Sequence, residues 1–118
     1  MFGEEMAEKK KVRVLMVCAI GMSSSLIEQK TTKVAEEAGV PFEIKAIDVP
    51  EVGRWDFGEN PVDIVLIAPQ ARFKKRSIDQ AAAPHGILVE NIDSVAYGMI
   101  DGEKIFEQIM TALKGQEE

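Results

Sequence analysis

Cysteine and histidine are almost absent from this chain of 118 residues, which holds one of each, Cys18 and His85. A single cysteine excludes an internal disulfide and a metal site built from several thiolates, and a single histidine leaves no zinc-binding pattern. We therefore expect no metal site of these kinds. A chain without a disulfide framework is typical of a reducing compartment.

An excess of positive charge is absent as well, because 20 acidic residues outnumber 14 basic ones and give a formal net charge of −6. The short basic runs at 9–13 and 73–77 are too small to neutralise a nucleic-acid backbone, so we expect no nucleic-acid partner. No apolar run reaches the roughly 18 residues of a membrane span, and the run before Cys18 is too short for a secretory signal. The sequence thus predicts a cytoplasmic protein.

The length of the chain suits one domain with a hydrophobic core of its own. Residues 1–10 show no apolar period and are interpreted as a flexible lead-in. We expect a single domain over residues 11–115, followed by a short tail at 116–118.

Apolar runs alternate with segments of helical period along the domain. Strands are predicted at 12–20, 41–49, 62–68 and 86–92, separated in one place by a long turn-rich segment at 50–61. A first helix is predicted between a capping box of Ser25 with Glu28 and a stop at Gly39. A weaker helix is predicted at 72–83, with Phe73, Ile78 and Ala82 on one side. A final helix is predicted from 101, with Ile105, Ile109, Met110 and Leu113 as its apolar face and Gly115 as its end.

This order of elements predicts an α/β fold with a four-stranded parallel sheet flanked by helices on both faces. Ligands of such sheets bind at the carboxyl ends of the strands. Three connections should meet there: the one after Cys18, the one that begins with Pro69 and Gln70, and the one at 91–94. We expect Asp93 and Ser94 to cap or turn the chain rather than act as an acid or base.

Cys18 has two interpretations. A lone cysteine in an apolar strand is more often a small buried hydrophobic residue than a nucleophile. Its position favours the second interpretation, because a loop with glycine and hydroxyl side chains at a helix N-terminus can surround an anion with N–H donors. The same surroundings lower the pKa of a thiol, whose thiolate is the reactive form. The donors would be the backbone N–H groups of Ile20 through Ser25 and the hydroxyls of Ser23, Ser24 and Ser25.

Two chemistries use a phosphate on or near such a cysteine. A cysteine phosphatase needs an arginine six residues after the cysteine to hold the phosphoryl group, and that position is Ser24 here. The nearest downstream arginine is Arg54. Slow hydrolysis is what a phosphoryl carrier needs, so the missing arginine favours a carrier.

The chain resembles a known family in three ordered segments. "VCAIGMSSSLI" is similar to the phosphocysteine loop of the IIB component of the lactose/cellobiose/chitobiose branch of the bacterial sugar phosphotransferase system. "VDIVLIAPQARF" is similar to that family's third strand with the Pro-Gln that follows, and "IDSVAYGMIDGEKIFEQIM" to its carboxyl-terminal segment. The resemblance covers about residues 12–113. Ala68 stands where the family commonly has glycine, and the segment at 50–61 matches no family pattern.

The resemblance implies a phosphotransferase in which Cys18 accepts phosphate from a histidine of a IIA partner. It implies transfer onward to a sugar of the cellobiose, lactose or chitobiose class held by a membrane IIC partner, which would bring the protein to the inner face of the membrane. The family's phosphate-binding loop would map onto Ala19, Ile20, Gly21, Met22, Ser23, Ser24 and Ser25. Pro69, Gln70 and Tyr97 would line the same end of the sheet. Such a transfer calls for no metal and no organic cofactor. Met22 and Leu26 are candidate apolar contacts for a partner, although Leu26 could equally belong to the core.

Three other readings stay open at this stage. A IIB-like regulatory or binding module would keep Cys18 and the loop without serving transport. A cysteine phosphatase or an arsenate-reductase-like enzyme is disfavoured by Ser24. In an inert domain with a structural cysteine, the thiol would react slowly and its pKa would not be lowered.

Overall fold

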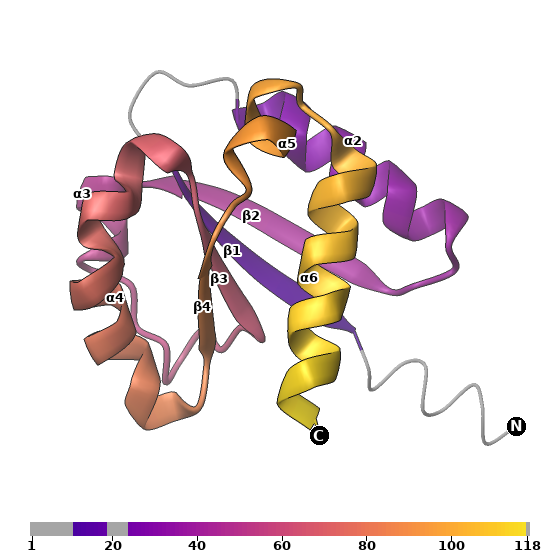
Figure 1. The fold of residues 1–118 in the computed structure, drawn as a ribbon. Coiled ribbons are helices and arrows are strands. Elements are labelled where there is room, and N and C mark those ends of the chain that lie inside the picture. Colours follow the sequence, from indigo (N-terminus) through magenta and orange to yellow (C-terminus); the bar gives the residue numbers. More distant parts are fainter. Residues whose placement is uncertain (1–10, 19–23, 118) are drawn as a thin grey trace, which may run out of the picture.

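A computed structural model describes residues 11–18 and 24–117 of the chain (Figure 1). The residues predicted as a lead-in, 1–10, and five of the predicted loop residues, 19–23, lie outside the described residues. The elements follow one another as β1 (Val12–Cys18), α2 (Ser24–Glu37), β2 (Phe42–Asp48), α3 (Val49–Val52), β3 (Ile64–Ile67), η1 (Pro69–Lys74), α4 (Lys75–Ala82), η2 (Ala83–His85), β4 (Leu88–Asn91), α5 (Ser94–Gly98) and α6 (Gly102–Glu117).

The four strands form one parallel sheet in the order β2-β1-β3-β4, which confirms the predicted sheet. β1 is an interior strand, and the pairing of Val17 with Ile67 sets β3 beside its last residues. The ladder continues past the strands, because Ala68 N–H donates to Val17 O at 2.9 Å and Ile92 N–H donates to Ile67 O at 2.8 Å. The connections after β1, β3 and β4 therefore meet at one end of the sheet, which we call the carboxyl edge.

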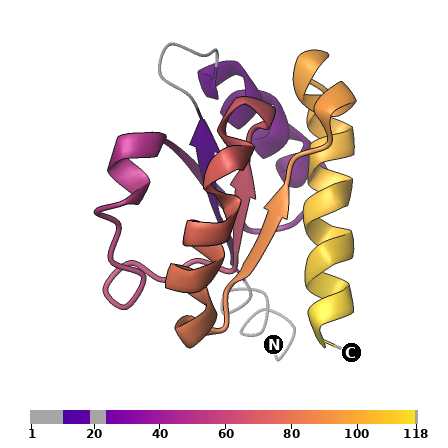
Figure 2. The same cartoon turned by 60° about the vertical axis from the view of Figure 1, so that its left-hand side comes forward.

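The core consists of two clusters, and alternate residues of β1 contribute to each. Val14, Met16 and Cys18 belong to one cluster, whose helical residues come from α2, α5 and α6. Leu15 and Val17 belong to the other, whose helical residues come from α3, η1 and α4. Figures 1 and 2 show α4 on one side of the sheet and α2 with α6 on the other. The continuous apolar sequence of β1 thus reflects burial on both of its faces.

The start of α2 differs from the prediction. The helix begins at Ser24, so Ser25 lies inside the first turn and does not cap it. The Glu28 carboxylate accepts a hydrogen bond from Ala46 N–H at 2.6 Å and so joins α2 to the open edge of β2. The predicted capping box is wrong, because Ser25 lies inside the helix and the Glu28 carboxylate binds Ala46 of β2 rather than the start of α2.

The end of α2 agrees with the prediction. Gly39 has φ +73°, its N–H donates to Glu36 O at 3.0 Å, and Val40 N–H donates to Ala35 O at 2.9 Å. This is the Schellman arrangement, in which a left-handed residue, usually glycine, closes the helix.

The connection after β3 breaks the periodicity assumed for 72–83. Residues 69–74 form a 3₁₀ helix with three residues per turn, so Phe73 does not share a face with Ile78 and Ala82. Phe73 is 74% exposed whereas Ile78 is 3% exposed, so the prediction that Phe73 shares one side with Ile78 and Ala82 is wrong.

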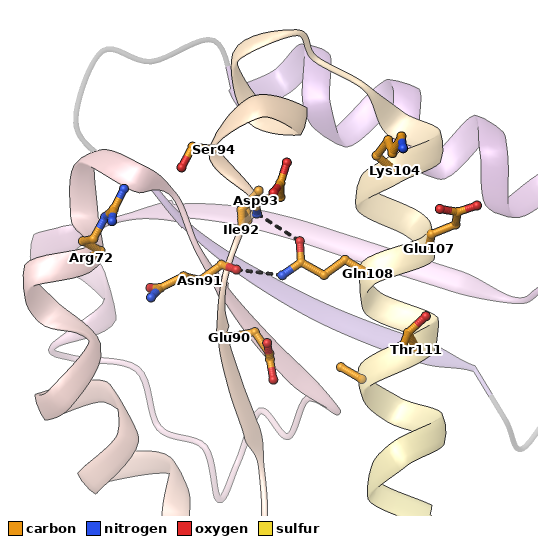
Figure 3. A pocket seen from close by; sticks show the side chains of 11 residues that line it. Arg72, Glu90, Asn91, Ile92, Asp93, Ser94, Lys104, Glu107, Gln108 and Thr111 are labelled. Carbon is orange, nitrogen blue, oxygen red and sulfur yellow. Dashed lines mark hydrogen bonds between the residues drawn. The ribbon is translucent and has the colours of Figure 1, made fainter.

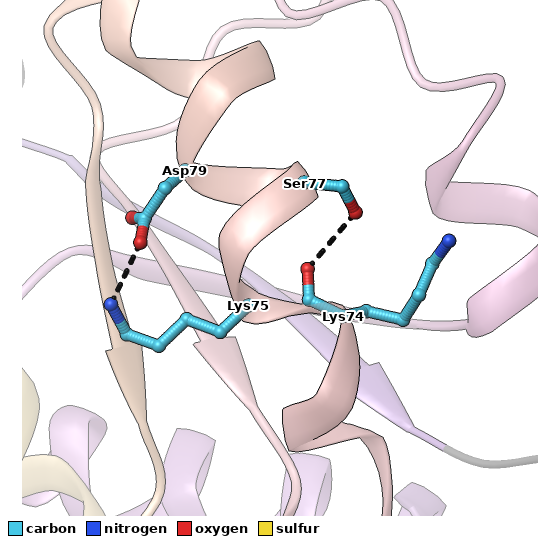
Figure 4. Close-up of polar contacts among 4 residues, drawn as sticks. All are labelled: Lys74, Lys75, Ser77 and Asp79. Carbon is cyan, nitrogen blue, oxygen red and sulfur yellow. Dashed lines mark hydrogen bonds and ion pairs between the residues drawn. The ribbon is translucent and has the colours of Figure 1, made fainter.

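The first turn of α4 is held by local polar contacts (Figure 4). Ser77 Oγ donates to Lys74 O at 3.1 Å, and the ammonium of Lys75 pairs with the Asp79 carboxylate at 2.9 Å. An exposed pair at this i,i+4 spacing contributes about 0.3–0.5 kcal/mol, so the buried Ile78 matters more for the stability of α4.

The end of the last helix was also predicted wrongly, because α6 runs to Glu117, past Gly115. The short helix α5 was not predicted, although its cap was. Asp93 is the N-cap of α5 and accepts Ala96 N–H at 2.9 Å, and Ser94 is the first residue of the helix.

Gly102 is where α6 passes closest to α2. A Cβ at Gly102 would lie 2.7 Å from the backbone carbon and oxygen of Lys30, so a backbone would have to move. We predict that Gly102→Ala lowers the free energy of unfolding by about 1–3 kcal/mol, measured by urea denaturation.

Gly115→Ala is the matched control for that measurement, because Gly115 lies on the same helix and a Cβ there would meet nothing within 4 Å. Alanine should stabilise α6 there by roughly 0.5–1 kcal/mol. Equal effects of the two substitutions would contradict the close approach of α2 and α6.

Candidate functional site

Cys18 is the last residue of β1 and lies at the carboxyl edge of the sheet. Cys18 is 3% exposed and belongs to the first of the two core clusters. That cluster also contains Ala68 after β3, Ile92 after β4 and Tyr97 of α5. The side chain therefore faces the side of the sheet covered by α2, α5 and α6. Segments that follow three different strands surround the thiol.

Tyr97 is the polar neighbour of Cys18. The pKa of Tyr97 is raised from 10.0 to about 12, first by burial and then by the negative charge of the Cys18 thiolate and a hydrogen bond to Cys18. A hydrogen bond that raises the pKa of a phenol is one in which the O–H donates. Tyr97 Oη thus donates its proton to Cys18 Sγ.

This contact acts on the thiol in the opposite sense to burial. Burial among apolar side chains disfavours a thiolate, whereas a hydroxyl that donates to sulfur stabilises it. A structural thiol packed as a hydrophobic residue needs no such donor. Among the described residues, the Tyr97 hydroxyl is a group that favours the thiolate form of Cys18.

The remaining predicted site residues lie around the same edge. Pro69 and Gln70 begin η1 directly after β3, with Pro69 partly buried and Gln70 exposed. Ser24 and Ser25 are the first two residues of α2. The predicted phosphate-loop residues Ala19, Ile20, Gly21, Met22 and Ser23 lie outside the described residues.

The N-terminus of α2 has the electrostatics of an anion-binding end. Its 14 residues carry no acidic side chain in the first turn. The first N–H groups of a helix lack intrahelical partners and carry a partial positive charge, which favours a nearby anion. An acidic residue in that turn would have opposed a phosphate.

An open cavity of about 770 Å³ lies beside β4 and α6 (Figure 3). It is lined by charged and polar side chains, among them Arg72, Glu90, Lys104 and Glu107, and Cys18 is not one of them. Gln108 also lines the cavity, and its side-chain amide forms hydrogen bonds to the main chain at Asn91 and Asp93. The sequence had no signal for this residue, because its role depends on where α6 lies against the sheet.

His85 and Trp55 have structural contacts. The ring of His85 lies 6.2 Å from that of Phe57, and Trp55 Nε1 donates to Asn60 O at 3.2 Å. Across residues 11–18 and 24–117, no group of three or more His, Cys, Asp or Glu residues is arranged to hold a metal ion. No helix in the same ranges is long and apolar enough to cross a membrane.

Fold and site define a parallel α/β domain whose one cysteine ends the first strand at the ligand-binding edge of the sheet. The model of the family described as PTS system, lactose/cellobiose-specific IIB subunit, matches residues 13–108. The chain therefore belongs to this family of IIB components of the sugar phosphotransferase system, and it is a phosphotransferase.

Curated relatives carry the same component name. The oligo-beta-mannoside-specific EIIB component of Bacillus subtilis (strain 168) is 36% identical over 104 residues, which cover 88% of this chain and 98% of the relative. The cellobiose-specific EIIB component of Lactococcus lactis subsp. lactis (strain IL1403) is 31% identical over 94 residues, 78% of this chain and 87% of the relative.

Solved structures show the same fold. The cellobiose-specific IIB component from Borrelia burgdorferi has a TM-score of 0.68 at 31% identity, over 90% of this chain and 94% of that one. The lactose-specific IIB domain from Streptococcus pneumoniae has a TM-score of 0.71 at 18% identity, over 89% and 97%, and supports the fold alone.

The contact between Tyr97 and Cys18 predicts an unusual tyrosine titration. Tyr97 is the only tyrosine of the chain, so the ultraviolet absorbance of its phenolate reports one group. The midpoint should lie near pH 12 in the folded protein and near 10 in urea. Because the folded state holds this proton more tightly, stability is unaffected below about pH 10 and falls as the pH rises from 10 to 12.

Cys18→Ala removes two of the three causes of the shift but leaves burial, the largest. The midpoint of this variant should fall below that of the wild type and stay above 10. Ser94→Ala, at the start of α5, is the control and should titrate like the wild type. A Cys18→Ala variant with an unchanged midpoint would show that the two side chains do not interact.

Proposed function

We propose that the protein carries a phosphoryl group on Cys18 between a phosphohistidine of a IIA protein and a sugar bound by a membrane IIC protein. The sugar belongs to the class of β-linked or galactose-containing sugars, such as cellobiose, lactose or chitobiose. The protein acts in the cytoplasm, at the inner face of the membrane where IIC lies. The relatives named for oligo-beta-mannoside, galactose and cellobiose systems support this class.

The chemistry is an in-line displacement performed twice. In the first step the Cys18 thiolate attacks phosphorus, a S–P bond forms, and the P–N bond breaks with its electron pair on the imidazole nitrogen, which then takes a proton. In the second step a sugar hydroxyl attacks the same phosphorus, an O–P bond forms, and the S–P bond breaks to regenerate the thiolate. The hydroxyl proton leaves to a base on the acceptor side.

The observation that carries this proposal is the hydrogen bond from Tyr97 to Cys18 at the carboxyl edge. A donor on the sulfur stabilises the thiolate as nucleophile in the first step and as leaving group in the second. The N-terminus of α2, free of acidic residues in its first turn, favours the charge on the equatorial phosphoryl oxygens. The absence of an arginine at Ser24 disfavours hydrolysis and so favours a carrier over a phosphatase.

A surface for protein partners lies around the same edge. Among the residues that the structure describes, four large apolar side chains are exposed: Leu26, Phe73, Val95 and Met99. They lie in the first turn of α2, in η1, and in or directly after α5, which are the segments that follow β1, β3 and β4. Leu26 is 43% exposed and so is not a core residue. These four residues form the proposed apolar docking surface for IIA.

Basic side chains next to this surface indicate the charge expected on the partner. Arg72, Lys74, Lys75 and Arg76 flank Phe73 in η1 and at the start of α4. A partner with an apolar centre and an acidic rim would complement them.

Phosphorylation of Cys18 is tested by intact mass. After incubation with phosphoenolpyruvate and the upstream phosphotransfer proteins, including a IIA, we expect one added phosphoryl group that persists for minutes. The Cys18→Ser variant should gain no comparable adduct. Absence of an adduct with several IIA proteins, together with an unreactive thiol, would return Cys18 to a structural role.

The docking surface is tested by the kinetics of transfer from IIA. Phe73→Ala should raise the concentration of phosphorylated IIA that gives half the maximal rate by about fivefold or more, as loss of an apolar anchor does. Its melting temperature should not change, because the side chain is 74% exposed. Gln80→Ala, an exposed position on α4, is the control. Unchanged kinetics in a Phe73→Ala, Val95→Ala double variant would rule out this surface.

A further inference from the structure

The side-chain amide of Gln108 occupies a position at the free edge of β4 that a neighbouring strand would otherwise take. Gln108 Nε2 donates to Asn91 O at 2.7 Å, and Asn91 is the last residue of β4. Gln108 Oε1 accepts from Asp93 N–H at 3.0 Å. In a parallel sheet, a residue of the adjacent strand uses this pair of main-chain groups, one on each side of the residue opposite.

The direction in which Gln108 projects from α6 is set by its buried neighbours on that helix. The residues three before and one after it on α6, Ile105 and Ile109, are both fully buried in the cluster that contains Cys18 and Tyr97. Their burial fixes how α6 turns toward the sheet. Figure 3 shows both hydrogen bonds of Gln108 reaching from α6 to the end of β4.

The main chain to which Gln108 is hydrogen-bonded continues directly into α5, the helix that contains Tyr97. Asp93 accepts Ala96 N–H through its side chain at 2.9 Å and Tyr97 N–H through its carbonyl at 2.9 Å. These bonds start α5, a helix of only five residues. A helix that short is not stable by itself, so its position depends on how its first residue is anchored.

We propose that Gln108 is a positioning residue, which holds the junction of β4 and α5 so that the Tyr97 hydroxyl donates to the Cys18 sulfur. The inference rests on the proposed role of Cys18 and extends it to a residue on α6 that touches neither the thiol nor the phosphate. A hydrogen bond weakens steeply when its angle or distance departs from the optimum. A small shift of α5 therefore changes how strongly the Tyr97 hydroxyl stabilises the Cys18 thiolate. Gln108 therefore controls the reactivity of Cys18 through Tyr97.

The test is a double-mutant cycle on the unphosphorylated protein. The rate of Cys18 alkylation by iodoacetamide against pH gives the thiol pKa for the wild type, Gln108→Leu, Tyr97→Phe and the double variant. Tyr97→Phe should raise this pKa by on the order of one unit and so reduce the thiolate near neutral pH by about tenfold. Gln108→Leu should shift it in the same direction, by up to the same tenfold, and should add nothing in the Tyr97→Phe background.

The tyrosine supplies a second readout. In Gln108→Leu the phenolate titration of Tyr97 should fall below about 12 because the contact with Cys18 weakens. Thr111→Val is the matched control, since Thr111 lines the same cavity one turn further along α6. It should leave both titrations unchanged.

Three results would overturn the proposal. Gln108→Leu could lower the melting temperature without moving the thiol pKa, which is the result expected of a purely structural edge residue. The shift could also persist in full in the Tyr97→Phe background. If Gln108→Leu does not fold, Gln108→Glu keeps the acceptor for Asp93 and loses the donor to Asn91, and a wild-type thiol pKa in this variant would decide against the proposal.

These outcomes are separate from those of the proposed function, because no step of the cycle needs a phosphoryl donor. A thiol that is coupled to Gln108 but is never phosphorylated would refute the carrier function alone. A phosphorylated Cys18 whose pKa ignores Gln108 would refute the positioning role alone.

Discussion

The parallel pairing of β1 with strands on both sides is the constraint on which the structure depends. β2 and β3 both pair with it, and its residues alternate between the two core clusters. Helices from both halves of the chain pack on residues of this one strand. Its last residue is Cys18, so the most constrained strand of the fold ends in the residue that carries the proposed chemistry. A residue at the end of a buried interior strand is held in a fixed position, and a fixed position suits in-line transfer.

The hydrogen bond with Tyr97 favours the functional over the structural interpretation of Cys18. The residue is as buried as the apolar residues around it, and burial alone would make it an inert thiol. The hydroxyl of Tyr97 forms a hydrogen bond with the sulfur from α5, and Tyr97 lies six residues after Asn91, the last residue of β4. Family membership, the carboxyl-edge position and this donor all point to one chemistry.

The sheet was predictable because strand burial leaves a direct mark on the residues. The runs at 12–20 and 62–68 are continuous and apolar, and the structure places strands inside both at Val12–Cys18 and Ile64–Ile67. The stop at Gly39 was predictable for a similar reason, since a left-handed residue at a helix end requires glycine or asparagine. The convergence of Cys18, Pro69 and Asp93 on one edge followed from the parallel order alone.

The errors had different causes. The Glu28 carboxylate binds the distant Ala46 N–H of β2 instead of the helix end. A local 3₁₀ segment places Phe73 on a different side from Ile78, and α6 continues past Gly115. The amino-acid sequence by itself determined the parallel sheet, the place of Cys18 at its edge and the class of chemistry, because these depend on local runs and chain order. Only the tertiary structure decided that Tyr97 donates to Cys18 and that Gln108 holds the end of β4. Those contacts join residues 79 and 17 positions apart, and nothing local in the chain records them.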